Sequence, residues 1–179
     1  IYQKNTDSVH VYFNNVNITG DDDAGIAYYL DYTNKTKSIN VINNNFINDA
    51  GGYSVYLTDN ASLLKEDNNN LYSTGLYIGA FNSQLVDTLA AWIAATGNDS
   101  NSISTDPYYY SVTNLHTSSK LLDGAGIPAG NVTNDFDGET RSTSAPDIGA
   151  DEFSPYANDG GILSIDSPFV GCAGKHPVF

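Results

Sequence analysis

The feature that most constrains the fold is a short phrase that recurs in the first half of the chain, in which two asparagines precede an apolar residue. The three copies, 30 and 25 residues apart, are Asn14-Asn15-Val16, Asn44-Asn45-Phe46 and Asn69-Asn70-Leu71. The text around them also repeats, with Val9–Val11 matching Ile39–Val41 and Ala27–Leu30 matching Ser54–Leu57. A repeat of this length with alternating apolar and polar residues predicts a solenoid, in which each turn buries its apolar face on its neighbours.

The composition predicts that this solenoid is built from β-strands. The 179 residues include 13 Tyr and 7 Phe but no Met, and the chain is rich in Asn, Thr and Ser, which together favour strands and turns. We therefore expect an all-β fold with coils over residues 1–86, including strands within 39–47 and 53–57. Asparagine tolerates the left-handed backbone of a sharp turn, and stacked copies can hydrogen-bond to one another. The predicted repeat ladder consists of Asn14, Asn15, Asn44, Asn45, Asn69 and Asn70.

The charge of the chain limits its partners. The formal net charge is -14, from 21 acidic and seven basic residues. Phosphate backbones and anionic membranes are bound by positive charge, so we expect neither a nucleic-acid partner nor a membrane-surface one. No apolar run is long enough to span a bilayer, so direct membrane insertion is not expected either. Neutral sugars, Ca²⁺ and other proteins remain as partners. The chain starts at Ile1 and holds no Met, which favours a piece of a longer polypeptide.

Residues 87–153 are predicted to cap the solenoid. Leu89–Ala94 fits a short amphipathic helix, with Asp87 as N-cap and Gly97 as C-terminal stop. An open solenoid end exposes strand edges and apolar side chains, so a helix here would cover them. Trp92 is expected to be part of this plug, and a sugar-stacking platform is the alternative. Residues 154–161 read as a linker. Residues 162–179 read as the first strand of an incomplete β-sandwich module, in which Cys172 has no internal disulfide partner.

Several motifs in the second half give the chain a family resemblance. They occur in the order Leu89–Trp92, Asn98–Ile103, Asp106-Pro107, Asp135–Arg141 and Pro146–Phe153. This order resembles the C-terminal end of secreted right-handed parallel β-helix proteins of the pectin-lyase-like class, common in large surface proteins of the Bacteroidetes. The tail through Cys172–Val178 resembles the opening of the immunoglobulin-like modules that follow such β-helices.

Some proteins of this kind are giant adhesins of gliding bacteria, exported by type 9 secretion. The resemblance therefore implies an extracellular, cell-surface protein: a stiff β-helical rod segment that binds glycans or a solid surface and adjoins further domains of the same chain. Outward-facing aromatic rings and Asn or Asp side chains would supply the stacking and the hydrogen bonds.

A carbohydrate-active enzyme, a hydrolase or lyase on the same fold, is the alternative function. Asn5-Thr6-Asp7 and Gly20–Asp23 resemble two motifs of polygalacturonases, whose carboxylates act as acid and base. Their Gly-His-Gly and Arg-Ile-Lys motifs are absent, and no arginine precedes Arg141. A lyase needs a base beside a cation, and the seven cations show no clustering in the sequence. We therefore predict no catalytic residues in this chain.

The acidic loop near the end of the cap allows two interpretations. Asp135, Asp137 and Glu139 offer the closely spaced oxygens that Ca²⁺ prefers in a glycine-bearing loop. Alternatively, Arg141 is buried in a bidentate pair with Asp137, Asp147 or Asp151, which would lock the cap. Ca²⁺ is the only cofactor that the sequence suggests. His116 and His176 have no metal-ligating partner at a useful spacing, so both are expected to be structural or exposed.

Overall fold

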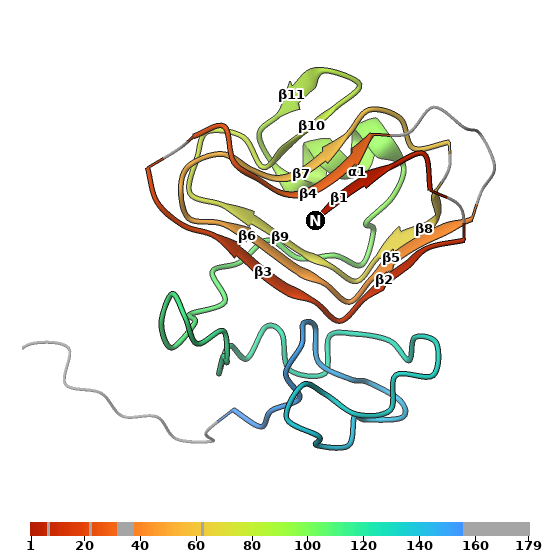
Figure 1. The fold of residues 1–179 in the computed structure, drawn as a ribbon, viewed down its shortest axis with the longest axis vertical. Helices are drawn as coiled ribbons and strands as arrows, with labels where there is room; N and C mark the ends of the chain where they lie inside the picture. Colours follow the sequence, from red (N-terminus) through yellow and green to blue (C-terminus); the bar gives the residue numbers. More distant parts are fainter. Residues whose placement is uncertain (7, 22, 32–37, 62, 156–179) are drawn as a thin grey trace, which may run out of the picture.

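The computed structural model describes residues 1–6, 8–21, 23–31, 38–61 and 63–155. Over these residues the protein is mostly β, with three parallel sheets and one α-helix (Figure 1). The predictions of a strand-rich fold, of parallel strands built from repeats and of one short helix are therefore confirmed. The three sheets are open and are not closed on one another. The predicted strand within 162–179 and most of the predicted linker lie outside the described residues.

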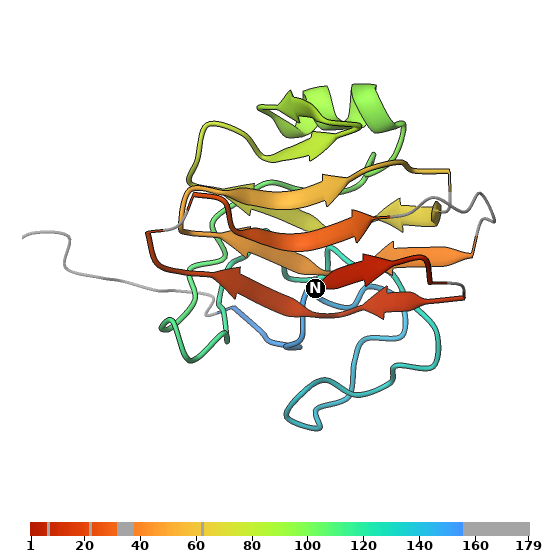
Figure 2. The ribbon, with the colours of Figure 1, turned by 45° about the horizontal axis from the view of Figure 1, so that its top comes forward.

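The strands enter the three sheets in a fixed order. The first sheet contains β1 (Tyr2–Lys4), β4 (Ile26–Asp31), β7 (Tyr53–Leu57), β10 (Gly79–Phe81) and β11 (Gln84–Val86). The second contains β2 (His10–Tyr12), β5 (Ile39–Ile42) and β8 (Leu63–Asp67), and the third contains β3 (Asn15–Ile18), β6 (Asn45–Asn48) and β9 (Asn70–Ser73). The chain thus visits the first, second and third sheets in turn, and we call each such round a pass. Figure 2 shows the passes stacked on one another.

The register of the strands follows the sequence repeat. Val11 lies beside Val41, Asn15 beside Asn45, and Asn45 beside Asn70. All strand pairs are parallel except β10–β11. The core lies between the three sheets, where the rings of Tyr28 and Phe46 stack with centroids 5.0 Å apart. Apolar side chains from the three sheets therefore form one buried core.

The corner between the second and third sheets is a sharp turn in every pass. Its first residue has a left-handed backbone each time, with φ of 55° at Phe13, 61° at Asn43 and 54° at Asn68. Two of these positions are asparagine, the residue that best tolerates this conformation after glycine. The two asparagines that follow each corner residue form two separate ladders.

The inner ladder joins Asn14, Asn44 and Asn69. The Asn44 Oδ1 accepts from the backbone N–H of Asn14 at 3.1 Å and from its Nδ2 at 2.8 Å. The Asn44 N–H and Nδ2 donate to Asn69 Oδ1 at 2.9 and 3.1 Å. Beyond Asn69, the Asp99 carboxylate takes the next position and accepts from Asn69 Nδ2 at 3.1 Å. Each turn is thereby tied to the next by buried side-chain bonds.

The outer ladder is incomplete: it joins Asn70 to Asn45, while among the described residues Asn70 and Asn15, but not Asn45, bond to the chain that follows the helix. Asn70 Nδ2 donates to Asn45 Oδ1 at 2.8 Å and to Thr105 O at 2.9 Å. Asn15 donates to Leu115 O at 2.9 Å, and its Oδ1 accepts from the N–H of Ala150 at 3.1 Å. The repeated asparagines therefore serve the stack of passes and the attachment of residues 105–150.

The helix α1 (Leu89–Thr96) lies at the end of the stack beside β10 (Figure 2). Its N-cap is Thr88, whose side chain accepts from the N–H of Ala91, so the prediction of Asp87 was wrong by one residue. The physical reason is that Thr88 directly precedes the first helical residue and has the extended backbone that lets its hydroxyl reach the first turn. Gly97 is the C-cap with φ of 72°, as predicted.

Within the described residues, no helix has the length and apolar character that crossing a membrane requires.

The predicted cap region, residues 87–153, lies in two places. The helix covers the end of the stack, and Ile103 pairs with Asn70 as a parallel bridge. The chain from about Leu115 onward then runs under the corner between the second and third sheets (Figure 1). There Asn43 Nδ2 donates to Ile127 O at 2.6 Å, and Asn68 Nδ2 donates to Ala125 O at 3.1 Å. We call residues 115–155 the corner segment.

Candidate functional site

Trp92 is a core residue. Its side chain is fully buried, its ring meets Phe81 edge-on, and its Nε1 donates to Asp99 Oδ2 at 2.9 Å. Asp99 also accepts from Asn69, so Trp92 links the helix to the inner asparagine ladder. The alternative of a sugar-stacking platform is wrong, because no face of the indole is accessible.

A buried carboxyl group lies beside this contact. Val11, Val41 and Glu66 occupy the same position in successive passes, so Glu66 points into the core. Both of its carboxylate oxygens are buried. Burial, and then the nearby Asp99 carboxyl, raise the pKa of Glu66 well above its usual range. Glu66 therefore favours the neutral acid, which is far less costly to bury than a carboxylate.

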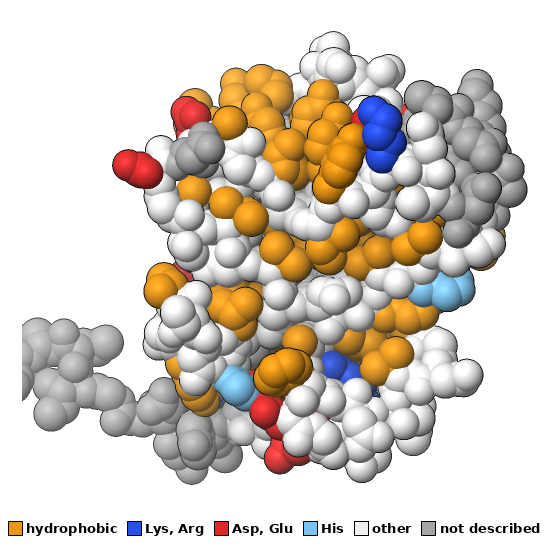
Figure 3. All heavy atoms as spheres, viewed as in Figure 1, with side chains coloured by type: hydrophobic (Ala, Val, Ile, Leu, Met, Phe, Trp, Pro, Cys, Tyr) orange, Lys and Arg blue, Asp and Glu red, His pale blue; other side chains and the backbone are white. Residues whose placement is uncertain are grey.

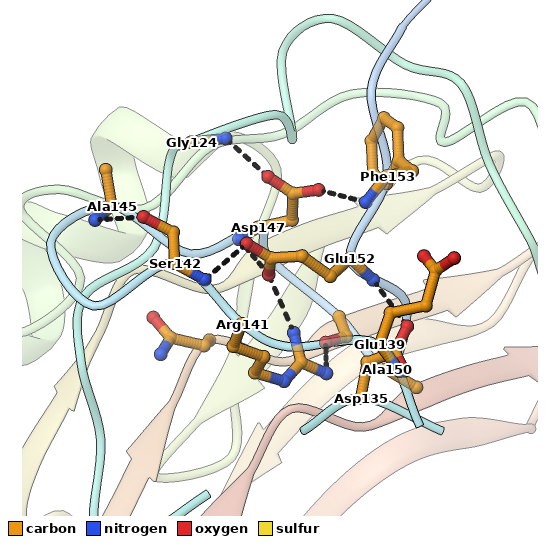
Figure 4. A network of polar contacts seen from close by, with 12 residues as sticks. Gly124, Asp135, Glu139, Arg141, Ser142, Ala145, Asp147, Ala150, Glu152 and Phe153 are labelled. Atoms are coloured by element: carbon orange, nitrogen blue, oxygen red, sulfur yellow. Dashed lines mark hydrogen bonds and ion pairs between the residues drawn. The ribbon is translucent and has the colours of Figure 1, made fainter. Parts of the chain in front are cut away.

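Arg141 holds the corner segment to the first pass. It is only 4% exposed, and its guanidinium carbon lies 4.0 Å from the centre of the Phe13 ring. Nη1 donates to Glu152 Oε2 at 3.3 Å, and Nη2 donates to Gly149 O at 3.1 Å (Figure 4). The prediction that Arg141 is buried agrees with this geometry.

The predicted partner of Arg141 was wrong. Neither Asp137 nor Asp147 nor Asp151 pairs with it, and the contact to Glu152 uses one nitrogen instead of two. The reason is that Asp147 is already occupied by backbone donors, with Oδ1 accepting from Gly124 at 2.6 Å and Oδ2 from Phe153 at 2.7 Å. Burial raises the pKa of Asp147 to about 6. Arg141 and Asp147 thus stabilise the same segment by separate contacts.

The residues predicted to bind Ca²⁺ are not brought together as a set. Asp135 Oδ1 accepts from the backbone N–H groups of Asp137 and Glu139, at 3.0 and 2.7 Å. Its Oδ2 accepts from the N–H of Glu152 at 3.0 Å. Asp135 therefore shapes the hairpin that ends in the bridge between Asn134 and Thr140. Asp137 alone of the three joins a group of metal-ligating side chains.

That group is His116, Asp137 and Asp151. One ligand atom from each lies within 4.8 Å of the others. His116 Nε2 and Asp137 Oδ2 are 2.6 Å apart, and Asp151 is buried beside them. The prediction that His116 has no metal-ligating partner was wrong, because the fold brings in aspartates from the hairpin and from the end of the corner segment, far along the chain.

These side chains line a pocket of about 410 Å³. Its walls also include Asn15, the turn of residues 113–115, and Phe136, whose ring is 83% exposed. In Figure 3 the hollow lies in the lower half, where a histidine and acidic side chains come together. A second hollow, of about 580 Å³, lies over Asp147 and Glu152. Its carboxylates are less available to a ligand, because both already accept hydrogen bonds from backbone N–H groups.

The pocket is electrostatically negative. The hydrogen bond to Asp137, with the charges of Asp151 and Asp135, raises the pKa of His116. Burial raises the pKa of Asp151, and the N–H of Thr117 hydrogen-bonds its carboxylate. A positive ion is therefore favoured at the centre of this group.

A ladder of tyrosines lies on the outer face of the first sheet. Tyr2, Tyr29 and Tyr56 are in register on β1, β4 and β7. Neighbouring rings have centroids 5.1 and 4.8 Å apart. Tyr28 and Leu30, which flank Tyr29, are fully buried, so the ring of Tyr29 points to the opposite face of the sheet. The three rings thus form one continuous aromatic strip.

Polar groups border this strip. Tyr2, 59% exposed, donates its hydroxyl to Asp31 Oδ2 at 3.0 Å, and Lys4 Nζ lies 2.7 Å from the same oxygen. Tyr53 adds a fourth ring, with its centroid 6.4 Å from that of Tyr56. The strip therefore combines flat apolar faces with hydroxyl, ammonium and carboxylate groups. This is the arrangement that suits a ligand with one apolar face and a polar rim.

Comparisons with protein-family models, with curated proteins and with solved structures gave no match to this chain. The tyrosine strip and the pocket around His116 are the two candidate functional features of the described residues.

Proposed function

We propose that the chain is the C-terminal part of a right-handed parallel β-helix and serves as a rigid segment of an extracellular cell-surface adhesin. The passes through three parallel sheets would be the coils of the helix. The two asparagine ladders support this reading, because side-chain bonds between coils resist bending and twisting of a stack. The adhesin class, with surface attachment, gliding motility and type 9 export, rests on the sequence resemblance.

The edge formed by β1, β2 and β3 supports the same proposal. Each of these strands pairs on one side only within the described part of the chain. The opposite end carries α1 and the buried Trp92. Apolar side chains lie between the sheets at the β1–β3 end (Figure 3). An unpaired edge above an apolar interior is suited to a further coil of the same polypeptide.

The single observation that carries the binding function is the tyrosine strip of Tyr2, Tyr29 and Tyr56. These three tyrosine rings offer a large, rigid contact area, and ordering them on binding costs little conformational entropy, as for tyrosines in other recognition surfaces. The proposed ligand is a neutral glycan, because the net charge of -14 repels acidic polymers. Successive sugar rings would stack on successive tyrosines, and Lys4 and Asp31 would bond their hydroxyl groups.

The test is a glycan-array screen followed by titration calorimetry on the saccharide that binds. The variant is Tyr29→Ala combined with Tyr56→Ala, and the matched control is Tyr108→Ala, an exposed tyrosine outside the strip. Loss of two central aromatic contacts should weaken binding by roughly 30-fold, the scale of about 2 kcal/mol for a hot-spot residue. Equal binding by the wild type and the double variant contradicts the proposal.

A carbohydrate-active enzyme is the second candidate, and one observation favours it. The carboxylates of Asp137 and Asp151 converge with His116 on an open pocket, as an acid and base pair would. An assay for release of reducing ends or unsaturated uronates from polysaccharides tests this function. Activity that disappears in Asp137→Asn would establish the enzyme, whereas no product from a broad polysaccharide panel would reject it.

A further inference from the structure

We propose that His116, Asp137 and Asp151 bind a divalent transition-metal ion, with Zn²⁺ as the best match. The proposed metal site is separate from the tyrosine strip, which lies on the first sheet. It is the pocket between the turn of residues 111–116, the hairpin of residues 134–140 and the end of the corner segment.

The spacing of the donor atoms suits a metal better than a glycosidase pair. The imidazole nitrogen and the two carboxylate oxygens all lie within 4.8 Å of one another. Ligands at the usual Zn–N and Zn–O distances of about 2.0–2.2 Å are separated by roughly 3–3.5 Å. An ion at the centre would therefore widen the 2.6 Å separation of His116 Nε2 and Asp137 Oδ2 slightly and draw donors that are up to 4.8 Å apart closer together. The carboxyl groups of glycosidases are instead held about 5–9 Å apart to admit the sugar or a water.

The histidine is oriented for this role by its neighbour. Asn114 Oδ1 accepts from the backbone N–H of His116 at 3.1 Å and also contacts the ring Nδ1. A side-chain oxygen on Nδ1 holds a proton there, so Nε2 becomes the metal-ligating nitrogen once an ion displaces the proton that Nε2 donates to Asp137. The Nε2 atom is also the one that faces Asp137. Such an outer partner is the usual companion of a metal-bound histidine, which it fixes in tautomer and orientation.

The two aspartates are positioned in the same way. Asp151 is buried, and the N–H of Thr117 hydrogen-bonds its carboxylate. The N–H of Asp137 donates to Asp135 Oδ1 at 3.0 Å, which fixes the hairpin that carries it. Each ligand is thus attached to a different turn, and all three turns are held by backbone bonds before any ion arrives.

The donor set selects the class of metal. Ca²⁺ takes six to eight oxygen ligands and has little affinity for imidazole. One imidazole with two carboxylates suits Zn²⁺ and neighbouring transition metals. Three protein ligands would leave at least one coordination position open, and the three side chains line a pocket that has room for its occupant. A water molecule or an oxygen atom of a ligand would occupy it.

The experiment measures metal binding to the metal-free protein by calorimetry, first with Zn²⁺ and then with Ca²⁺. Co²⁺ binding is followed by its visible spectrum, which reports a nitrogen and oxygen ligand set directly. The variants are His116→Ala and Asp137→Asn, with His10→Ala as the matched control because it removes a histidine far from the pocket. Circular dichroism of each metal-free variant checks that the fold is retained.

The wild type and His10→Ala should bind one Zn²⁺, and Zn²⁺ more tightly than Ca²⁺. His116→Ala and Asp137→Asn should each weaken Zn²⁺ binding by about 100-fold or more, and Asn114→Leu by about 10- to 100-fold. Equal Zn²⁺ affinity in His116→Ala and the wild type would overturn the assignment. Absence of binding to the wild type at millimolar Zn²⁺, or tighter binding of Ca²⁺ than of Zn²⁺, would overturn it as well.

Discussion

Replacing Asn44 by alanine should destabilise the protein more than any other single change in the asparagine ladders. Asn44 is fully buried in the middle pass. Its Oδ1 accepts two bonds from Asn14, and its Nδ2 donates to Asn69 Oδ1 and to the carbonyls of Val11 and Ile42, at 2.8 and 3.2 Å. The variant removes all five bonds and leaves the carbonyl of Val11 without this donor.

The magnitude follows from these contacts. Each net bond contributes about 0.5–1.5 kcal/mol, and a buried group left unpaired costs more. Because several of the five bonds share an atom, we expect a loss of about 3–5 kcal/mol in the free energy of unfolding. For a chain of this size that corresponds to a fall in Tm of about 10 °C.

The assay is urea unfolding followed by the fluorescence of Trp92, the only tryptophan. Asn14→Ala is the control, because Asn14 is half-buried at the edge of the ladder and, among the described residues, its side chain donates to Tyr12 O and Asn44 Oδ1 alone. The control should lose about 1 kcal/mol. If Asn44→Ala and Asn14→Ala lose the same stability, the inner ladder does not hold the passes together.

Three further predictions concern the buried polar groups. Trp92→Phe removes the indole bond to Asp99 and should cost about 2 kcal/mol in urea unfolding monitored by circular dichroism; an unchanged midpoint would contradict the structural role of this contact. Arg141→Ala removes the ion pair with Glu152, the bond to Gly149 O and the contact with the Phe13 ring, and should cost about 3–5 kcal/mol, with faster proteolysis of the corner segment than in wild type; equal proteolysis would argue against its role. Lowering the pH from 8 to 5 should stabilise the protein, because the folded states of Glu66 and Asp147 have raised pKa values and so bind protons that the unfolded chain releases. With its pKa moved from 3.8 to about 6, Asp147 alone contributes about 1 kcal/mol by pH 5, and this stability is lost as the pH rises through 6. Glu66→Gln should flatten the pH profile of the unfolding free energy, and an unchanged profile would show that Glu66 does not titrate in this range.

The sequence predicted the repeating part of the fold well, because each pass buries the same positions. The Asn-Asn phrase alone identified the corner, and the match of Ala27–Leu30 to Ser54–Leu57 placed Tyr29 beside Tyr56. Tyr2 continues this series 27 residues earlier, and that spacing could have revealed the whole strip from the sequence. The end of the helix was also predictable, since Gly97 is a local signal that depends on few neighbours.

The contacts of the corner segment could not be predicted, because that segment has no repeat and almost no regular structure. The hydrogen bond between His116 and Asp137 joins residues 21 positions apart. No local spacing rule covers such a pair. The partner of Arg141 was missed for a similar reason: several acids lie nearby in sequence, and backbone donors decide which of them stays free. Glu66 was missed because it occupies a position that its counterparts fill with valine.

The most direct test of the proposed function is to map where a bound saccharide contacts the protein. Protein with isotope-labelled tyrosine would be titrated with the saccharide found by the array. The resonances of the tyrosine rings would be followed by NMR spectroscopy. The proposal predicts that the signals of Tyr2, Tyr29 and Tyr56 shift together and saturate with one dissociation constant. Shifts confined to Tyr110, whose ring stacks on that of His116 with centroids 6.3 Å apart, with the strip unchanged, would contradict it.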